Sequence, residues 1–346
     1  MKSRNLLRAF TRCHVTVTRQ WLSLLLMAVF PAIGRADTDW ESLPYTKHRQ
    51  LQASLANGSP AFSGDSFPIK LTGVILNNPS DMLDGTPNFI PWSGGSTAFA
   101  LGAQWQMFIQ SVDPADQGGT ALYMAQNYGN FPWVADSLAS YSNEQWLGEL
   151  QRLTLDGTLE VGDLVEVRAR VGLPFGGKYN VNEAHSNDPD NDFEIVVLQK
   201  NHGLPSPVDI TISDVKNELD QDIFDFTGNI GGERFQSQLV RLQNVHLMSD
   251  AGWTPDGEVF VTDESGRTLR VKLGLNKDFL DLEAPLGAFD VVGIFNQESS
   301  GYQIWVMDPQ GIAAVPEAST FVLVSAASGL GIFWHRRRRA GKGTGQ

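Results

Sequence analysis

Cysteine is nearly absent from the chain of 346 residues. The one cysteine, Cys13, lies in a basic N-terminal stretch ahead of the first apolar run, so it is not placed for lipid attachment. The region that follows can form no disulfide, thiolate metal site or cysteine nucleophile. Its stability must therefore come from a packed core, which a region of this length can supply.

Familiar catalytic motifs are also missing. The sequence has no nucleophile elbow, no zinc-binding helix motif and no phosphate loop. Residues 172–178 contain glycines and a lysine, but they lack the spacing and the hydroxyl residue of a phosphate loop and indicate a hairpin turn. Carboxylates are so abundant that a two-carboxylate glycosidase stays open. On balance these absences favour a protein that is not an enzyme.

Basic residues are scarce in the centre of the chain. Six of the 26 lysines and arginines lie in residues 1–36 and five in 315–346, whereas one of the 39 acidic residues lies in these ends. Residues 37–314 thus hold 15 basic and 38 acidic side chains, a formal charge of −23. Nucleic-acid binding draws much of its affinity from neutralised phosphates. This charge disfavours a nucleic-acid partner unless calcium bridges the two.

The first 36 residues are predicted to be a secretory signal peptide. Five basic residues and no acidic residue precede the apolar run from Trp21 to Phe30. Gly34 and Ala36 then supply small residues at positions −3 and −1 of a cleavage site after Ala36. An uncleaved anchor is the alternative, but the apolar run is short for a membrane span.

The last 32 residues combine a polar motif, an apolar run and a basic stop. The motif consists of Val315, Pro316, Glu317, Ala318, Ser319 and Thr320. The uncharged residues 320–334 would form a helix of about 22 Å, short of the roughly 30 Å hydrocarbon core. The positive-inside bias would hold the residues that follow in the cytoplasm; these are Arg336, Arg337, Arg338 and Arg339. A buried terminal helix is the alternative, but a core helix would not normally end in four arginines.

This tripartite tail, residues 315–346, resembles the PEP-CTERM sorting signal of Gram-negative bacteria. The resemblance implies processing by an exosortase-type transpeptidase, in species that make extracellular polysaccharide. Ala318 departs from the family pattern, because the second proline of that motif would stand there. The order and the spacing of the three parts are kept.

Between its ends the chain is predicted to be mainly β. After a polar lead-in at residues 37–65, short alternating strands with Gly, Asn and Asp turns form two units, 66–201 and 208–313. Each unit shows a five-strand order, which predicts two small antiparallel barrels in tandem. A β-sandwich is permitted by the same pattern. Residues 143–153 are predicted to form a short helix capped by Ser142 or Asn143.

The two units resemble OB-like domains that occur in tandem in secreted bacterial proteins, including modules beside extracellular nucleases. Residues 238–245, 261–266 and 289–294 carry the resemblance in the second unit. The first unit matches less closely because its loops are long. The resemblance implies two OB-like barrels, 66–201 with long loops and 208–313.

The densest polar cluster lies in a loop at residues 183–194. Its acidic residues alternate as oxygen ligands do in calcium loops, but Phe193 stands where an EF-hand requires glycine. A solvated turn is the favoured interpretation, and His185 as a transition-metal ligand or catalytic base is a further one. A calcium site in this loop would use Asp188, Asp190, Asp192 and Glu194.

Tryptophans in the predicted loops are candidates for ligand stacking. Trp92, Trp133 and Trp253 could stack on sugar rings or bases at an OB-type face. The alternative is that these rings pack over the barrel mouths. The tryptophans in predicted strands or in the helix are expected in the core.

These observations predict an exported, non-enzymatic binding or structural module. We expect the Sec-type export machinery and an exosortase-type enzyme as partners, and a polysaccharide or a surface protein as ligand. The C-terminal helix would anchor the chain in the inner membrane during transit to the cell surface or extracellular matrix. Apart from calcium no cofactor is predicted. The alternative function is an extracellular hydrolase of a glycan or nucleic-acid polymer.

Overall fold

A computed structural model describes most of the region between the two predicted sorting segments. The described residues are 38–78, 104–131, 134–155, 157–225, 229–298 and 301–315. All the described secondary structure lies in one compact region, between His48 and Ala314. The predicted signal peptide and sorting helix lie outside the described residues. Within these ranges no helix has the length and apolar character to cross a membrane.

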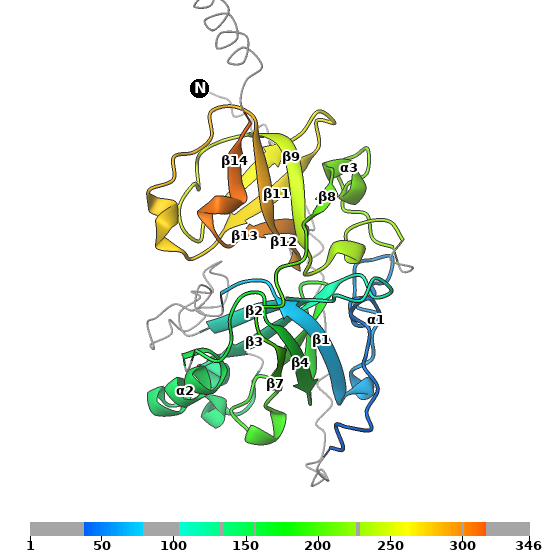
Figure 1. The fold of residues 1–346 in the computed structure, drawn as a ribbon, viewed down its shortest axis with the longest axis vertical. Coiled ribbons are helices and arrows are strands. Elements are labelled where there is room, and N and C mark those ends of the chain that lie inside the picture. Colours follow the sequence, from blue (N-terminus) through cyan, green and yellow to red (C-terminus); the bar gives the residue numbers. More distant parts are fainter. Residues whose placement is uncertain are drawn as a thin grey trace, which may run out of the picture. The chain divides into compact units, whose positions relative to one another are not determined.

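The first half of the described region forms a seven-stranded sheet of order β5-β6-β3-β2-β1-β4-β7 (Figure 1). All neighbouring strands are antiparallel except β3 and β6, which are parallel. The strands are β1 (Ile69–Ile75), β2 (Gln104–Gln110), β3 (Gly119–Ala125), β4 (Leu164–Ala169), β5 (Gly172–Phe175), β6 (Lys178–Asn182) and β7 (Glu194–Gln199).

This sheet is open, so the prediction of a closed barrel over residues 66–201 is wrong. β4 uses one edge to pair with β1 and the other to pair with β7. β6 likewise pairs with β3 on one side and with β5 on the other. The order therefore begins at β5 and ends at β7, and among the described residues no pairing joins these two edge strands.

Short helices accompany the open sheet. The predicted helix at 143–153 is confirmed as α2 (Asn143–Leu150), which continues as the π-helical turn η4 (Gln151–Leu155). Ser142 and Gln145 form a capping box at its start. The remaining short helices are α1 (His48–Leu51), η1 (Gly64–Ser66), η2 (Tyr128–Asn130), η3 (Ser137–Ala139) and η5 (Pro189–Asn191).

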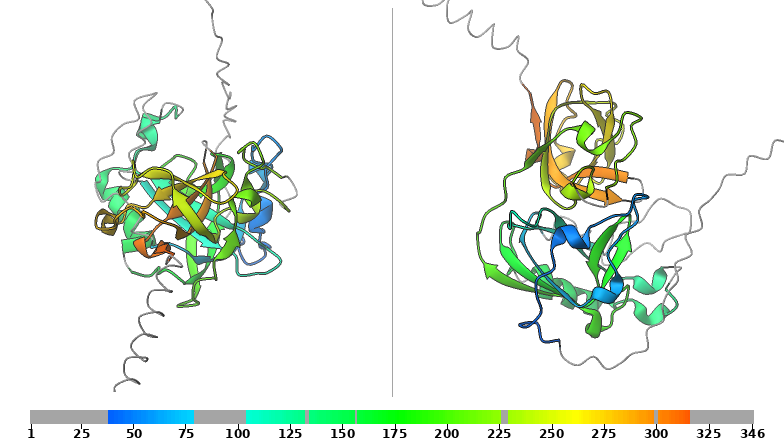
Figure 2. Two further views of the ribbon diagram at one scale, coloured as in Figure 1. Left: turned by 90° about the horizontal axis from the view of Figure 1, so that it is seen from above. Right: turned by 90° about the vertical axis from the view of Figure 1, so that its right-hand side faces the viewer.

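The second half contains a closed five-stranded barrel. Its sheet has the order β14-β12-β13-β11-β10-β9-β8, and an additional pairing of β12 with β9 closes the ring (Figure 2). The pairs β11–β13 and β8–β9 are parallel. The strands are β8 (Val208–Ile210), β9 (Leu239–Leu247), β10 (Glu258–Thr262), β11 (Thr268–Leu273), β12 (Phe289–Glu298), β13 (Gly301–Val306) and β14 (Ile312–Ala314). The short helices here are α3 (Ile212–Val215), η6 (Glu233–Phe235), η7 (Lys277–Leu280) and η8 (Pro309–Gly311).

Each half has its own hydrophobic core. In the barrel, strand β11 alternates as expected, with Leu269, Val271 and Leu273 buried. In the open sheet, strand β2 is buried at every position, because side chains cover both of its faces. Trp146 and Leu150 of α2 join the first core together with Trp105 of β2. A smaller third cluster contains residues of both sheets: Leu76, Phe108, Ala121, Ile294, Trp305 and Met307.

Candidate functional site

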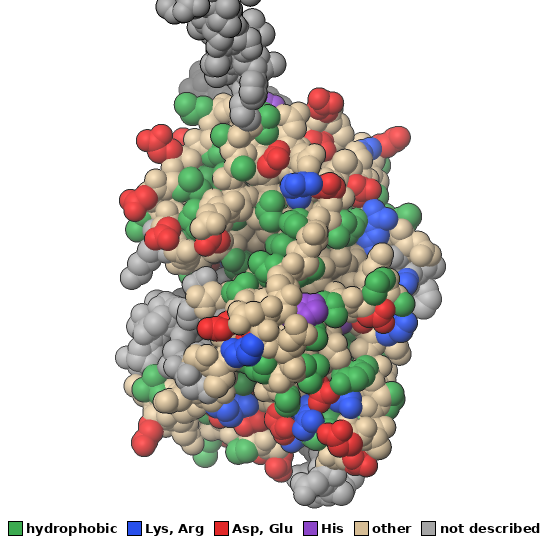
Figure 3. Space-filling model, viewed as in Figure 1, with side chains coloured by type: hydrophobic (Ala, Val, Ile, Leu, Met, Phe, Trp, Pro, Cys, Tyr) green, Lys and Arg blue, Asp and Glu red, His purple; other side chains and the backbone are tan. Residues whose placement is uncertain are grey.

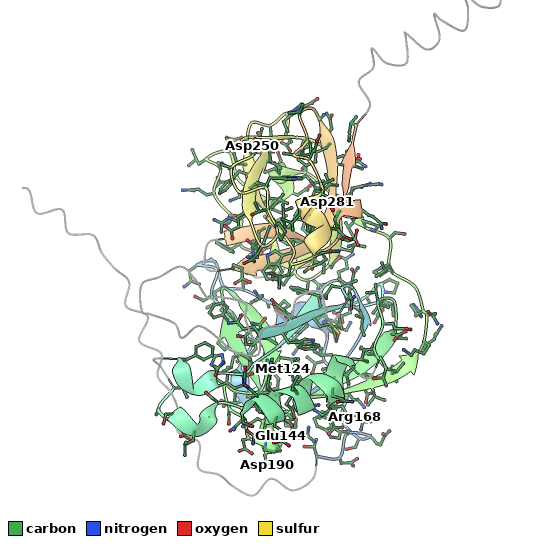
Figure 4. The ribbon with its side chains drawn as sticks, turned by 90° about the vertical axis from the view of Figure 1, so that its left-hand side faces the viewer. Met124, Glu144, Arg168, Asp190, Asp250 and Asp281 are labelled. Atoms are coloured by element: carbon green, nitrogen blue, oxygen red, sulfur yellow. The ribbon has the colours of Figure 1, made fainter. Side chains whose placement is uncertain are left out.

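The loop between β6 and β7 does not gather its four predicted calcium ligands. Asp188 accepts a hydrogen bond of 3.1 Å from the backbone N–H of Asp190 and so caps η5. Glu194 lies in β7 and pairs with Arg170 at 2.6 Å. Only Asp192 meets further carboxylates, and these come from outside the predicted set. Figure 4 shows this end of the sheet, with Glu144 of α2 and Asp190 of the loop labelled.

Three carboxylates from different elements converge beside α2. Glu149 in the last turn of α2, Glu183 directly after β6 and Asp192 before β7 each place one oxygen within 4.8 Å of the others. Two ligands on opposite sides of a calcium ion are about 4.6–5.2 Å apart, twice the usual calcium–oxygen distance. The spacing therefore allows all three carboxylates to contact one such ion.

The guanidinium of Arg152 lies among these carboxylates. Its Nη2 is 2.6 Å from Glu149 Oε2, 3.6 Å from Glu183 Oε1 and 4.0 Å from Asp192 Oδ2. Its Nη1 donates to the carbonyl oxygen of Phe193 at 2.9 Å. The side chain is 34% exposed, so it borders solvent on one side. The guanidinium thus approaches all three carboxyl groups, but only Glu149 lies within hydrogen-bonding distance of it.

Glu183 is the fully buried member of the cluster. Its Oε2 accepts hydrogen bonds from the hydroxyls of Tyr141 at 3.0 Å and Tyr128 at 3.3 Å. Its Oε1 has no hydrogen-bond partner, and the same is true of the buried Oδ1 of Asp192. Burial, followed by the charges of Asp192 and Glu149, raises the pKa of Glu183 to about 8. Burial, followed by the charge of Glu149, raises the pKa of Asp192 to about 6.

His185 lies next to this cluster without joining it. Its ring packs against Tyr128, with the ring centres 5.5 Å apart, and against Phe131 at 5.2 Å. Burial lowers its pKa to about 4, so the ring is neutral near pH 7. The backbone φ angles of Ala184 and His185 are both 53°, a left-handed turn that carries the chain away from β6.

Trp253, one of the three predicted stacking residues, is packed against the barrel. Its indole N–H donates to the carbonyl oxygen of Leu282 at 2.8 Å, and its ring meets Phe289 edge-on at 6.4 Å. This arrangement corresponds to the loop-packing alternative. Trp92 and Trp133 lie outside the described residues.

The predicted sorting motif lies almost wholly outside the described residues. Only Val315 is described, and its N–H donates to the carbonyl oxygen of Ala288 at 2.9 Å. Residues 316–346, with the apolar run and the four arginines, belong to the part of the chain that is not described.

An exposed aromatic residue lies on the outer face of the closed barrel. Phe260 of β10 is 45% exposed and pairs across the strands with Arg270 of β11. The guanidinium carbon of Arg270 is 5.5 Å from the ring centre of Phe260, and Arg270 lies 3.6 Å from the carboxylate of Glu258. Thr262 and Thr268 form the next cross-strand pair on the same face of the two strands. The face thus offers a ring surrounded by hydrogen-bonding groups.

Comparison with known proteins gives little further information. No family model matches the chain, and no curated protein matches it. Among solved structures it is similar to a deletion variant of the single-stranded DNA binding protein from Thermus aquaticus, with 13% identity and a TM-score of 0.14. That match covers 72% of this chain and 93% of the other. A TM-score this low carries no argument about function, so the class of protein rests on the fold itself: mainly β, with one closed barrel and one open sheet.

Proposed function

We propose that this chain is an exported binding module of the cell surface or extracellular matrix. Its ligand face would be the outer side of β10 and β11. The observation that carries the proposal is the exposure of Phe260 beside Arg270 on that face. An aromatic ring held on a rigid sheet with polar groups around it is suited to stacking against a planar or ring-shaped ligand.

The strand order of the barrel supports an OB-like assignment for the second unit. The ring β9-β10-β11-β13-β12, with β11 and β13 parallel, has the connectivity of an OB barrel. In OB-folds the face of the second and third strands binds oligonucleotides and oligosaccharides, and these strands correspond to β10 and β11. The open sheet repeats the pairings β1–β4 and β3–β6, which supports an OB-like first unit opened between β4 and β6.

The charge of the chain favours a saccharide over a nucleic acid as the ligand. Residues 37–314 carry a formal charge of −23, which repels phosphates. On the face seen in Figure 3, acidic side chains are scattered among basic and polar ones. A neutral or cationic saccharide can stack on Phe260 and form hydrogen bonds with Glu258 and Thr268.

The two ends of the sequence support export. The signal peptide would bring the chain to Sec-type machinery, and the tail from Val315 onward would bring it to an exosortase-type enzyme. Edman sequencing of the native protein tests the first step, since cleavage after Ala36 gives a chain that begins at Asp37. A blocked or intact Met1 terminus would contradict it.

The hydrolase alternative would give the carboxylate cluster a catalytic role. A carboxyl group with a raised pKa, such as Glu183, has the protonation state of a general acid near neutral pH. However, Glu183 is fully buried and its Oε2 is held by two tyrosine hydroxyls. A polymer could not approach this carboxyl without rearrangement of its surroundings, so the burial favours a binding function.

A glycan array probed with the purified full chain tests the ligand face. Phe260→Ala removes the exposed ring, and Leu286→Ala is a matched control because Leu286 is fully exposed and lies outside β10 and β11. Stacking of a base on an aromatic side chain contributes about 1–3 kcal/mol. With a sugar ring stacked to the same extent, Phe260→Ala should weaken binding about 5- to 150-fold. Leu286→Ala should bind as the unmodified chain does. If the unmodified chain bound no glycan on the array, or if both variants bound equally well, the ligand assignment would be overturned.

A further inference from the structure

The carboxyl groups of the cluster beside α2 are only partly satisfied by the arginine that lies among them. Glu149, Glu183 and Asp192 converge on Arg152, and of these three carboxyl groups only Glu149 accepts a hydrogen bond from it. The separations of 3.6 Å to Glu183 and 4.0 Å to Asp192 are beyond hydrogen-bonding distance. A buried polar oxygen without a close partner is costly.

Two oxygens of these carboxyl groups have no hydrogen-bond partner. Glu183 Oε1 is buried on the side of Arg152 and accepts no hydrogen bond, although the opposite oxygen of the same group accepts two. Asp192 Oδ1 is also buried without a hydrogen bond. Native proteins usually satisfy such atoms with protein, water or an ion. This observation is independent of the clustering of acidic residues, and it points to a missing partner.

We propose that Glu149, Glu183 and Asp192 bind a hard divalent cation of the calcium type, which takes the place of the Arg152 guanidinium. Only Asp192 belongs to the ligand set that the loop sequence predicts. The site joins α2 to the two ends of the β6–β7 loop, and it does not depend on the ligand proposed for β10 and β11.

The chemistry of the donors selects the kind of ion. All three side chains offer carboxylate oxygens, the ligands that calcium and magnesium prefer, and no thiolate or imidazole takes part. Departure of Arg152 would also release the carbonyl oxygen of Phe193, which accepts from its Nη1. Calcium accepts six to eight oxygens in flexible geometry, so waters can complete the shell. Magnesium requires a near-ideal octahedron and is the weaker candidate.

Arg152 can move because it lies at the solvent side of the cluster. Its side chain is 34% exposed, whereas the side chain of Glu183 is fully buried. An ion entering from solvent would displace the guanidinium rather than the buried carboxylate. Arg152 then competes with the ion for the carboxylates. This role differs from a purely structural one, in which Arg152 would only connect α2 to the loop.

Thermal melting of the chelator-treated full chain, with calcium or magnesium added, tests the proposal. Calcium should raise the Tm of the unmodified chain. Arg152→Ala should show a larger shift and reach half of it at a calcium concentration at least tenfold lower, because the competing cation is gone. Glu183→Gln should lose the shift. Asp190→Asn, an exposed acid in the same loop, is the matched control and should behave as the unmodified chain.

Terbium luminescence provides a readout that does not depend on unfolding. The Tyr141 hydroxyl is 3.0 Å from Glu183 Oε2, close enough to sensitise terbium bound at the cluster. The signal should be lost in Asp192→Asn, displaced by calcium and increased in Arg152→Ala. If Arg152→Ala is destabilised and neither calcium nor terbium binds it, the arginine is only a structural partner and the proposal fails. Loss of the signal in Asp190→Asn would instead place the ion in the loop and also overturn the site.

Discussion

The closed barrel and the open sheet start from equivalent pairings and end differently. Each has an antiparallel pair between its first and fourth long strands, β1–β4 and β9–β12, and a parallel pair, β3–β6 and β11–β13. In the barrel, β12 also pairs with β13 and the ring closes. In the open sheet, these two pairings belong to separate strands: β4 pairs with β1, and β5 pairs with β6. An edge strand is present in both regions, β14 on β12 and β7 on β4, so the difference lies in the interruption between β4 and β5 at Arg170 and Val171.

The difference affects what each region buries. A closed barrel satisfies its backbone through strand pairing and needs only an apolar filling. An open sheet must be completed by helices and loops, which bring polar groups and charges inside. Among the described residues, the barrel region buries one charged residue, Glu233. The open-sheet region buries six: Lys70, Asp116, Asp163, Glu166, Lys178 and Glu183. The candidate cation site is therefore found where the sheet is incomplete.

The largest effect on stability is expected from truncating the α2 side chain that is most deeply buried in the core of the open sheet. Trp146 is 1% exposed and belongs to the first core. Trp146→Ala should lower the free energy of unfolding by about 3–5 kcal/mol, the usual cost of truncating a buried aromatic residue. Hydrogen exchange should show lost protection in β1 to β7 first, because α2 contributes to that core. Urea denaturation followed by circular dichroism gives the magnitude.

Leu147→Ala is the matched control for this prediction. Leu147 is the next residue of α2 and is exposed, so its truncation should change stability by less than about 0.5 kcal/mol. If the two variants were equally stable, α2 would not complete the sheet. If β9 to β13 lost protection as early as β1 to β7, the two regions would unfold as one cooperative unit.

The sequence allows the strands to be predicted better than their closure. The alternation of apolar and polar residues in 268–273 agrees with the buried face of β11, and Ser142, one of the two predicted caps, begins α2. These features are local. Whether the sheet closes depends on pairings between segments far apart in the chain, such as β1 with β4 and β3 with β6, and no local pattern encodes these pairings.

The candidate site shows the same limit. Asp192 stands out in the sequence because it lies in an acidic loop, whereas Glu149 and Glu183 lack such a context and come together only in the folded chain. Alternation of the loop aspartates was a misleading signal, since Asp188 serves as a helix cap. A pairing of Glu149 with Arg152 at i,i+3 is visible in the sequence but is common on helices.

A smaller effect is expected from disturbing the closure of the barrel. Gly293 lies in β12, where an added Cβ would stand 2.5 Å from the carbonyl oxygen of Trp305. Gly293→Ala should cost about 1–3 kcal/mol, since a backbone atom has to move. Gly287→Ala is the control, because nothing lies within 4 Å of its added Cβ. Hydrogen exchange should show lost protection in β12 and β13 while β1 to β4 are unchanged. Equal stability of the two variants would show that the barrel tolerates a wider gap at this pairing.

The smallest effect expected concerns a histidine buried in the open-sheet region. His48 is fully buried in α1, and its Nε2 is 3.0 Å from the carbonyl oxygen of Thr72. A carbonyl can only accept, so Nε2 carries the proton and Nδ1 accepts from the hydroxyl of Thr120 at 2.8 Å. The nearby carboxylate of Asp116, which accepts from the backbone N–H of His48, opposes the effect of burial. Burial nevertheless lowers the pKa of His48 below its usual 6.5.

Stability should therefore fall on acidification because of His48. Below pH 6.5 the unfolded chain binds a proton at His48, whereas the folded chain does not. The stabilising contribution of His48 to the free energy of unfolding is therefore complete above pH 6.5, and below that pH it falls by up to about 1.4 kcal/mol per pH unit. Glu183 and Asp192, whose pKa values are raised, change stability with pH in the opposite direction. The measurement therefore compares two proteins: the free energy of unfolding in urea is determined at pH 7.5 and at pH 5.5 for the unmodified chain and for His48→Gln. His48→Gln should lose less stability between these values, whereas His246→Gln, at an exposed position in β9, should follow the unmodified chain. Equal losses of stability in all three proteins would show that burial does not lower the pKa of His48. The difference in buried polar groups between the two regions would then have no consequence for stability in acid.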